Sequence, residues 1–267
     1  MPSNPYLFLD ISTWGGALRR RAASWWHLIH FCALVLVMSL SPSTYNRANR
    51  VTTFQQIYAS TWQVLPWFTA LSALLSLVLI RIVVVTALSY GLSQYALQMV
   101  VRVLVLELIP LAAALFVALR AGLTFNAGLA RSTLQDLENP SPRLTLERLR
   151  HELVPSVMAS AFAVLTLAML SSVIALVLAY LTVYGVTLWA LPGYTRTVGQ
   201  VFDATVTVGF LLKTFLFSLA VAVVPLAANL EAARQDSSAA NTLQPGAVRL
   251  FLVLLLIEAA SLMVKYI

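Results

Sequence analysis

One stretch of the chain, from Val157 to Pro192, contains no charged residue at all. A helix needs about 20 apolar residues to cross a bilayer. This stretch is longer, so it is expected to tilt or to extend beyond the membrane. Gly185, Pro192 and Gly193 are typical of the end of such a helix and of the loop after it. The feature predicts a protein that is built inside a membrane.

Four further apolar stretches have the length of a membrane span. With 60% hydrophobic and 10% charged residues, against about 25% charged in a soluble domain, the chain has more apolar surface than a soluble core could hide. We therefore predict an all-α integral membrane protein with about five transmembrane helices and no soluble catalytic domain. The other four spans run from about Gln63 to Leu88, Leu97 to Leu119, Ala204 to Ala228 and Val248 to Met263.

The first 50 residues have a different character. Residues 25–40 are apolar but short for a crossing, and Trp25, Trp26 and His27 suit the headgroup zone. We interpret 1–50 as an amphipathic region with an interfacial elbow helix; an extra span is the alternative. Residues 51–267 then form the transmembrane domain, which a charged, proline-containing segment at about 127–152 interrupts.

Basic residues indicate the orientation, because cytoplasmic segments are enriched in Lys and Arg. With the N-terminus inside, five spans leave only Arg196 and Lys265 on the outside. The bias predicts an N-in/C-out topology. The inside segments would carry Arg19, Arg20, Arg21, Arg47, Arg50, Arg131, Arg143, Arg148, Arg150, Arg234 and Arg249.

Several ionisable residues fall within the predicted spans, where each is a candidate functional residue because charge at membrane depth is costly. Glu107 lies nearest the middle of a span and needs either a structural pair with Lys213 or a polar cavity. Arg102 lies off the face of Glu107 on an α-helix and can extend to the headgroups. Glu258 can make a polar contact between helices. Both readings of Glu107 stay open at this point.

Catalytic and metal-binding patterns are not found. The single cysteine, Cys32, and the pair His27 and His30 do not make a metal site. There is no GxxxxGK[ST] motif, so any nucleotide hydrolysis has to come from a partner chain. The net charge of +7 fits contacts with anionic lipid headgroups better than nucleic acid, because the basic residues flank apolar segments.

The stretch from Leu106 to Gly122 reads LELIPLAAALFVALRAG. It resembles the pattern RELGPVLxALxxAGRxGA of MlaE/YrbE-type permeases, the membrane subunits of ABC transporters that work with MCE proteins on lipids. The chain departs from the pattern at Leu106, Ile109 and Gly128, where the family has Arg, Gly and an acidic residue. Further stretches that agree in order and spacing are Gln56–Tyr58, Leu153–Pro155, Leu211–Phe215 and Glu258, the last where the family often has Asp.

The resemblance implies a permease subunit that moves lipid, expected to be phospholipid, between the bacterial inner membrane and a periplasmic MCE protein. It implies a dimer with a second permease copy or a homologue, and a cytoplasmic P-loop ATPase that binds the ATP, so this chain needs no cofactor. The intramembrane charges are the candidates for the substrate path, because a lipid path needs a few polar groups for the headgroup in an apolar cavity. These are Glu107, Arg102, Lys213 and Glu258.

In the resembled family a cytoplasmic helix docks the ATPase, and the corresponding segment here reads STLQDLENPSPRLTLERLR. Its two prolines, Pro140 and Pro142, predict a break, with a second helix from about Leu144 to Glu152. The alternatives are a non-transporting membrane scaffold and the divergent half of a heterodimeric permease. The predicted ATPase contacts are Asp136, Glu138, Glu147 and Arg150.

Overall fold

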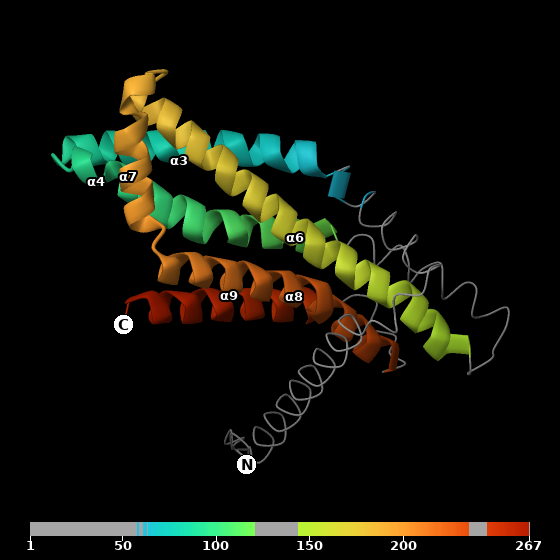
Figure 1. Cartoon of the computed structure of the whole chain (residues 1–267). Coiled ribbons are helices and arrows are strands. Elements are labelled where there is room, and N and C mark those ends of the chain that lie inside the picture. Colours follow the sequence, from blue (N-terminus) through green and yellow to red (C-terminus); the bar gives the residue numbers. More distant parts are fainter. Residues whose placement is uncertain (1–57, 59–60, 63, 121–143, 235–244, 267) are drawn as a thin grey trace, which may run out of the picture.

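In the computed structural model (Figure 1), five helices are long and apolar enough to cross a membrane. The structure describes residues 58, 61–62, 64–120, 144–234 and 245–266, and all regular structure within these ranges is helical. The prediction of an all-α membrane protein with five spans is confirmed. The elbow region at 1–50 lies outside the described residues. The five spans are Leu65–Ser89, Tyr95–Arg120, Val157–Tyr184, Ala204–Pro225 and Gly246–Val264.

The first span, α3 (Leu65–Ser89), turns sharply into α4 (Ser93–Val100). Pro66 stands in the first turn of α3, where its missing N–H costs nothing. Gly91 ends the helix with a φ of 71°, a left-handed conformation that glycine adopts without strain. The amide of Leu92 then donates to the carbonyl of Ala87 at 2.8 Å. The second span therefore begins directly beside the end of the first.

The second span changes its helical register within the membrane. α4 leads into η2 (Val101–Leu108), a π-helix, and regular α-helix resumes over 109–120. π-Helical segments are rare, and they occur frequently at functional sites. Two of the predicted site residues, Arg102 and Glu107, lie in this segment.

The third span is part of one long helix, α6 (Leu144–Tyr184). The predicted separate helix at 144–152 is wrong, because that stretch is the first part of α6 and the helix continues through Pro155. At 1.5 Å per residue, α6 is about 60 Å long. It thus extends well beyond a hydrocarbon core of about 30 Å.

α6 ends eight residues before the predicted boundary at Pro192. Gly185 has a φ of 69° and terminates the helix directly after Tyr184. A short 3₁₀-helix, η3 (Leu188–Ala190), and a separate helix, α7 (Leu191–Val201), follow. Pro192 and Gly193 therefore lie in the first turn of a helix and not in a loop, because proline suits that turn.

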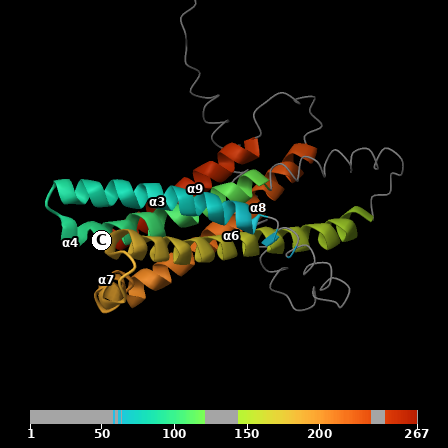
Figure 2. The same ribbon diagram turned by 90° about the horizontal axis from the view of Figure 1, so that it is seen from above.

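The last two spans pack on the side of α6 away from α3. α8 (Ala204–Arg234) contacts both α6 and α9 (Pro245–Tyr266), while α3 contacts α6 and α4. α7 lies across the direction of the spans at the end of the bundle where α3 meets α4 (Figures 1 and 2). The first span, α3, begins at one end of the bundle, and the last helix, α9, ends at the opposite end (Figure 1).

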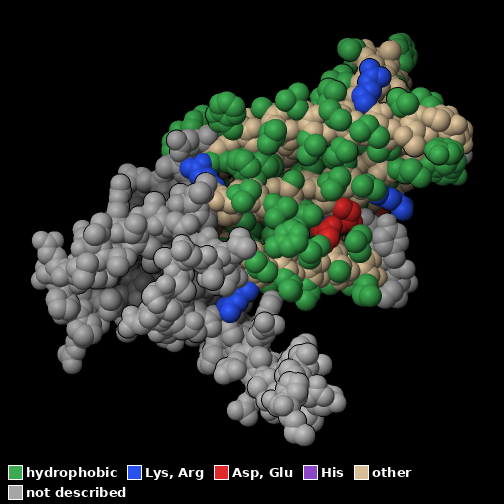
Figure 3. Space-filling model, turned by 180° about the vertical axis from the view of Figure 1, so that it is seen from behind, with side chains coloured by type: hydrophobic (Ala, Val, Ile, Leu, Met, Phe, Trp, Pro, Cys, Tyr) green, Lys and Arg blue, Asp and Glu red, His purple; other side chains and the backbone are tan. Residues whose placement is uncertain are grey.

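Hydrophobic side chains cover much of the outside of the bundle (Figure 3). A soluble monomer rarely exposes such large apolar patches, so this surface needs lipid or protein to cover it. The outermost spans, α3 and α9, are the most exposed of the five. Exposed examples on these two helices are Leu71, Leu74, Val78, Ile82, Phe251, Leu255 and Leu256.

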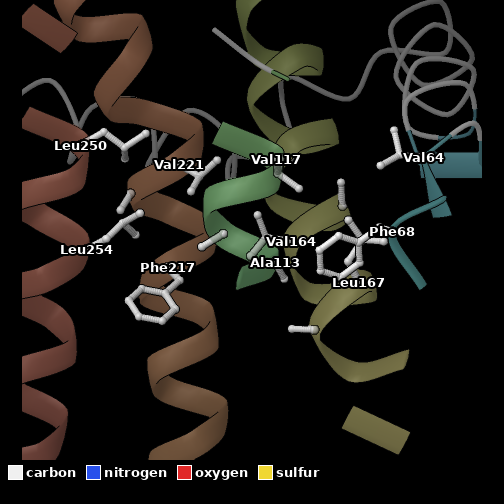
Figure 4. Packing of buried hydrophobic residues seen from close by; sticks show 14 of the residues in the cluster. Val64, Phe68, Ala113, Val117, Val164, Leu167, Phe217, Val221, Leu250 and Leu254 are labelled. Atoms are coloured by element: carbon white, nitrogen blue, oxygen red, sulfur yellow. The ribbon is translucent and has the colours of Figure 1, made fainter. Parts of the chain in front are cut away.

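The core consists of two hydrophobic clusters, one in each half of the bundle. The first joins residues of α3, the 109–120 helix, α6, α8 and α9, including Phe68, Leu167, Phe217 and Leu254 (Figure 4). The second lies around α4 and η2 and includes Ile80, Val101 and Phe210, with Tyr194 and Val198 of α7 packed against it. The boundary between the two clusters falls in the middle of α8, between Phe210 and Phe217.

Five spans with the arginine-rich segments on one side predict an N-in/C-out topology. An alkaline phosphatase reporter fused after Ile267 should be active, because it folds only outside the cytoplasm. A reporter fused within 127–143 is the matched control and should be inactive there. Cytoplasmic signal at both positions would contradict the five-span orientation.

Candidate functional site

A buried lysine lies at the boundary of the two hydrophobic clusters. The side chain of Lys213, on α8, is only 2% exposed. Its neighbours at helical spacing on the same face are Phe210 and Phe217, one from each cluster. The ammonium lies 5.7 Å from the centroid of the Phe217 ring, a cation–π contact. An ionised lysine at this depth requires acceptors.

Two carboxylates from two other spans supply them. Nζ of Lys213 donates a hydrogen bond to Oε2 of Glu107 in η2. It also lies 2.8 Å from Oε2 of Glu258 in α9. The three side chains, which we call the charge cluster, join the second, fourth and fifth spans.

A backbone carbonyl completes the surroundings of the ammonium. Pro110 has no N–H, so the carbonyl of Leu106, four residues earlier, lacks the donor that a regular α-helix would provide. Nζ of Lys213 lies 3.4 Å from this carbonyl oxygen and donates to it. Nζ of Lys213 therefore donates to two oxygen atoms, of Glu107 and Leu106, and lies within ion-pair distance of a third, on Glu258. The proline and the π-helical turn before it create the acceptor that Lys213 uses.

The two carboxylates are not equally satisfied. Oε2 of Glu258 is buried and close enough to Nζ for an ion pair, but no hydrogen bond of acceptable angle reaches it within the described residues. The side chains of Glu107 and Glu258 keep 15% and 14% of their surface exposed. The lysine is thus enclosed, while both acids lie at the edge of the packed bundle.

The energetics explain why these groups stay together. A single charge at the centre of a span costs about 2.5–3.5 kcal/mol on insertion scales. Pairing offsets that cost, but removing one partner of a buried pair leaves the other charge uncompensated, which costs about 3–5 kcal/mol. The charge cluster therefore couples the three spans to one another.

The structure brings together three of the four residues predicted for the substrate path. Arg102 is exposed and is not among the ion-paired side chains that the described ranges contain. The structural pair of Glu107 and Lys213, one of the two readings left open, is formed. Sequence reasoning missed the π-helix and the convergence of Glu258 on the same lysine. Pro110 signals in the sequence only that the carbonyl of Leu106 lacks its α-helical donor, and it does not specify a π-helix.

The predicted ATPase contacts lie at the edge of what the structure describes. Asp136 and Glu138 lie outside the described residues. Glu147 and Arg150 belong to the first turns of α6. They lie on the same continuous helix that forms the third span. Their role in ATPase coupling stays a prediction.

Comparison with known proteins identifies one family. The family model described as Permease MlaE matches residues 53–264. The match covers all five spans and every member of the charge cluster. No curated protein and no solved structure gives a significant match.

Replacement of Lys213 by Met should destabilise the protein by about 3–5 kcal/mol, because two buried carboxylates lose their shared cation. The measurement is the loss of monodisperse protein on heating in mild detergent. Arg102→Met is the matched control, a loss of positive charge at an exposed site in a neighbouring span, and should change the melting temperature little. Equal shifts for the two variants would contradict a buried charge cluster.

Proposed function

The chain belongs to the MlaE permease family, the membrane subunits of ABC lipid transporters, and on that premise we propose that it carries phospholipid between a bacterial inner membrane and a periplasmic MCE protein. The charge cluster would lie on the path of the lipid headgroup. The observation that carries this proposal is an enclosed lysine shared by two acids at the edge of an otherwise apolar bundle.

The location of the cluster supports a role in transport. Ionisable residues inside membrane spans typically face a cavity or the bundle interior, and they mark substrate and ion pathways. Acidic side chains reach a face of the molecule that is otherwise mostly hydrophobic (Figure 3). A lipid path needs this combination, because the acyl chains require apolar walls and the headgroup requires a few polar groups.

The chemistry of each group suggests how a headgroup would be held. The side chains of Glu107 and Glu258 keep 15% and 14% of their surface exposed, so an amine or hydroxyl of a phospholipid headgroup could approach both acids from that side. The guanidinium of Arg102 is suited to phosphate, which it can bind through two parallel N–H groups. Lys213 would hold the two acids in place. The lipid would thus contact the acids and Arg102, and not the enclosed lysine.

The remaining machinery would come from partner chains. We infer a cytoplasmic P-loop ATPase that binds ATP, a periplasmic MCE protein and a second permease copy or homologue. The charged segment before α6 is the proposed ATPase docking surface. Because α6 is one rigid helix from Leu144 to Tyr184, movement at that surface could be transmitted directly into the third span.

Glu107→Ala and Glu258→Gln should each reduce transfer several-fold per amount of folded protein, because each removes a carboxylate from the headgroup path while Lys213 keeps the other acid as its partner. The measurement is ATP-dependent transfer of fluorescent phospholipid from proteoliposomes that hold the permease with its ATPase to the MCE protein. Glu258→Asp should retain transfer, and Asp203→Asn, an exposed acid outside the spans, is the matched control. Wild-type transfer by both cluster variants would contradict the assignment.

Charge reversal at Asp136 and Glu138 together should weaken ATPase association or uncouple hydrolysis from transfer, because both acids are the proposed polar contacts. Co-purification of the ATPase and the ratio of hydrolysis to transfer measure the effect, and membrane insertion should be unchanged. If the double variant binds and transports normally, the scaffold or the heterodimer with a coupling-competent partner becomes the better account.

A further inference from the structure

The turn between α6 and α7 carries an unusually exposed apolar surface. Val186 is 90% exposed, Leu188 82% and Trp189 97%. Together with Leu191, they form a projection that we call the α6–α7 tip, visible where the yellow α6 meets the orange α7 (Figure 1). No charged residue occurs between Gly185 and Leu191. None of these side chains contributes to either hydrophobic cluster of the core.

The tip is held in shape by contacts directly beneath it. The hydroxyl of Tyr180 donates to the carbonyl of Thr187 at 2.5 Å, and the hydroxyl of Thr187 donates to the carbonyl of Tyr184 at 2.9 Å. The rings of Tyr180, Tyr184 and Tyr194 pack against one another with centroids 5.1–6.2 Å apart. These contacts hold the backbone of the tip in place, and the exposed Trp189 projects from it.

Tyr194 fixes the tip to the bundle. Its hydroxyl donates to the carbonyl of Leu176 at 2.8 Å. Burial raises the pKa of Tyr194 above its usual value, with a further contribution from Tyr184, so the hydroxyl stays a donor. α7 is consequently attached to the last turns of α6.

The third span is long enough for the tip to reach the level of the lipid headgroups. From Val157 to Tyr184 the span has 28 residues, which is about 42 Å of helix and exceeds a hydrocarbon core of about 30 Å. A strip of exposed apolar residues runs up this helix into the tip: Val173, Val177 and Leu181. The lipid-facing surface of α6 is therefore continuous with the tip.

α7 runs across the spans (Figures 1 and 2), with one face against the bundle and a polar face exposed. Its apolar side chains are used in packing on the bundle, so the tip, and not α7, presents the apolar surface at this end. The face toward the bundle carries Tyr194, Thr197, Val198 and Val201, and the exposed face carries Thr195, Arg196, Gly199 and Gln200.

Other aromatic side chains mark the same level. Tyr90 and Tyr95, in and after the turn between α3 and α4, are also exposed and lie at the same end of the bundle as α7 (Figure 1). Trp and Tyr are enriched at membrane–water interfaces because their rings are apolar with a polar group at the edge. Trp189 fits this belt, and the nearby cationic Arg196 suits lipid phosphate.

We propose that the α6–α7 tip is a membrane anchor, with Trp189 inserted at the boundary between headgroups and acyl chains of the membrane that the protein spans. The partner of this surface is lipid and not another protein. The anchor would hold the end of α6 at the membrane surface. It does not depend on the transport role proposed above.

The test measures the depth of the tip in a membrane without any partner protein. Cys32→Ser removes the chain's single cysteine, and Trp189→Cys then takes an environment-sensitive fluorophore. The protein is reconstituted into phosphatidylcholine–phosphatidylglycerol vesicles that carry a nitroxide either at the headgroup or deep in the acyl chain. A blue-shifted emission that the headgroup nitroxide quenches more strongly than the deep one is expected.

Two labelled positions calibrate the depth. A label at Val177, exposed within the span, should be quenched most by the deep nitroxide. A label at Thr195, on the polar face of α7, should be quenched less than the tip by both. Leu188→Cys repeats the measurement if Trp189→Cys does not fold. Emission and quenching at the tip equal to those at Thr195 would overturn the proposal and identify the tip as a water-exposed docking surface for protein.

Discussion

An ammonium group buried between two carboxylates in the middle of a membrane is the interaction on which the rest of the bundle depends. A lysine ammonium at that depth needs acceptors, which Glu107 and Glu258 supply, and these three residues come from three different spans. α9 packs mainly on α8 and is otherwise largely exposed. The contact of Glu258 with Lys213 therefore gives the last span a defined rotation and depth that its uniformly apolar surface could not.

Local backbone structure prepares the second span for this interaction. Glu107 lies in the π-helical segment from Val101 to Leu108, and Pro110 removes the α-helical donor of the Leu106 carbonyl, to which Lys213 donates. Both departures from regular helix would weaken an isolated helix. They are tolerated here because a cation from α8 satisfies the groups that they release. A permease has to rearrange its spans. A site in which a side chain from another span replaces a hydrogen bond within the helix is suited to such rearrangement.

The sequence predicted the spans well and their interactions only in part. Uninterrupted apolar stretches determine membrane helices, so the five spans and the confinement of ionisable residues to a few mid-span positions could be predicted. The end of α6 was misplaced because the apolar pattern continues to Pro192, whereas Gly185, one of three end signals in that stretch, is the residue whose backbone conformation ends the helix. The meeting of Glu258 with Lys213 depends on how helices rotate against one another, and periodicity is uninformative where every face is apolar. The π-helix depends on a hydrogen-bond register that residue types do not specify.

The coupling energy between Glu107 and Lys213 is the most direct measure of the charge cluster. Glu107→Gln, Lys213→Gln and the double variant are compared in thermal unfolding in detergent, which gives a double-mutant cycle. The account predicts that the double variant loses less stability than the two single variants together. The difference, which is the coupling energy, should be at least about 1 kcal/mol, because substitutions of contacting charges in one network do not have additive effects. Additive effects of the two substitutions would show that the residues do not interact and would contradict the account.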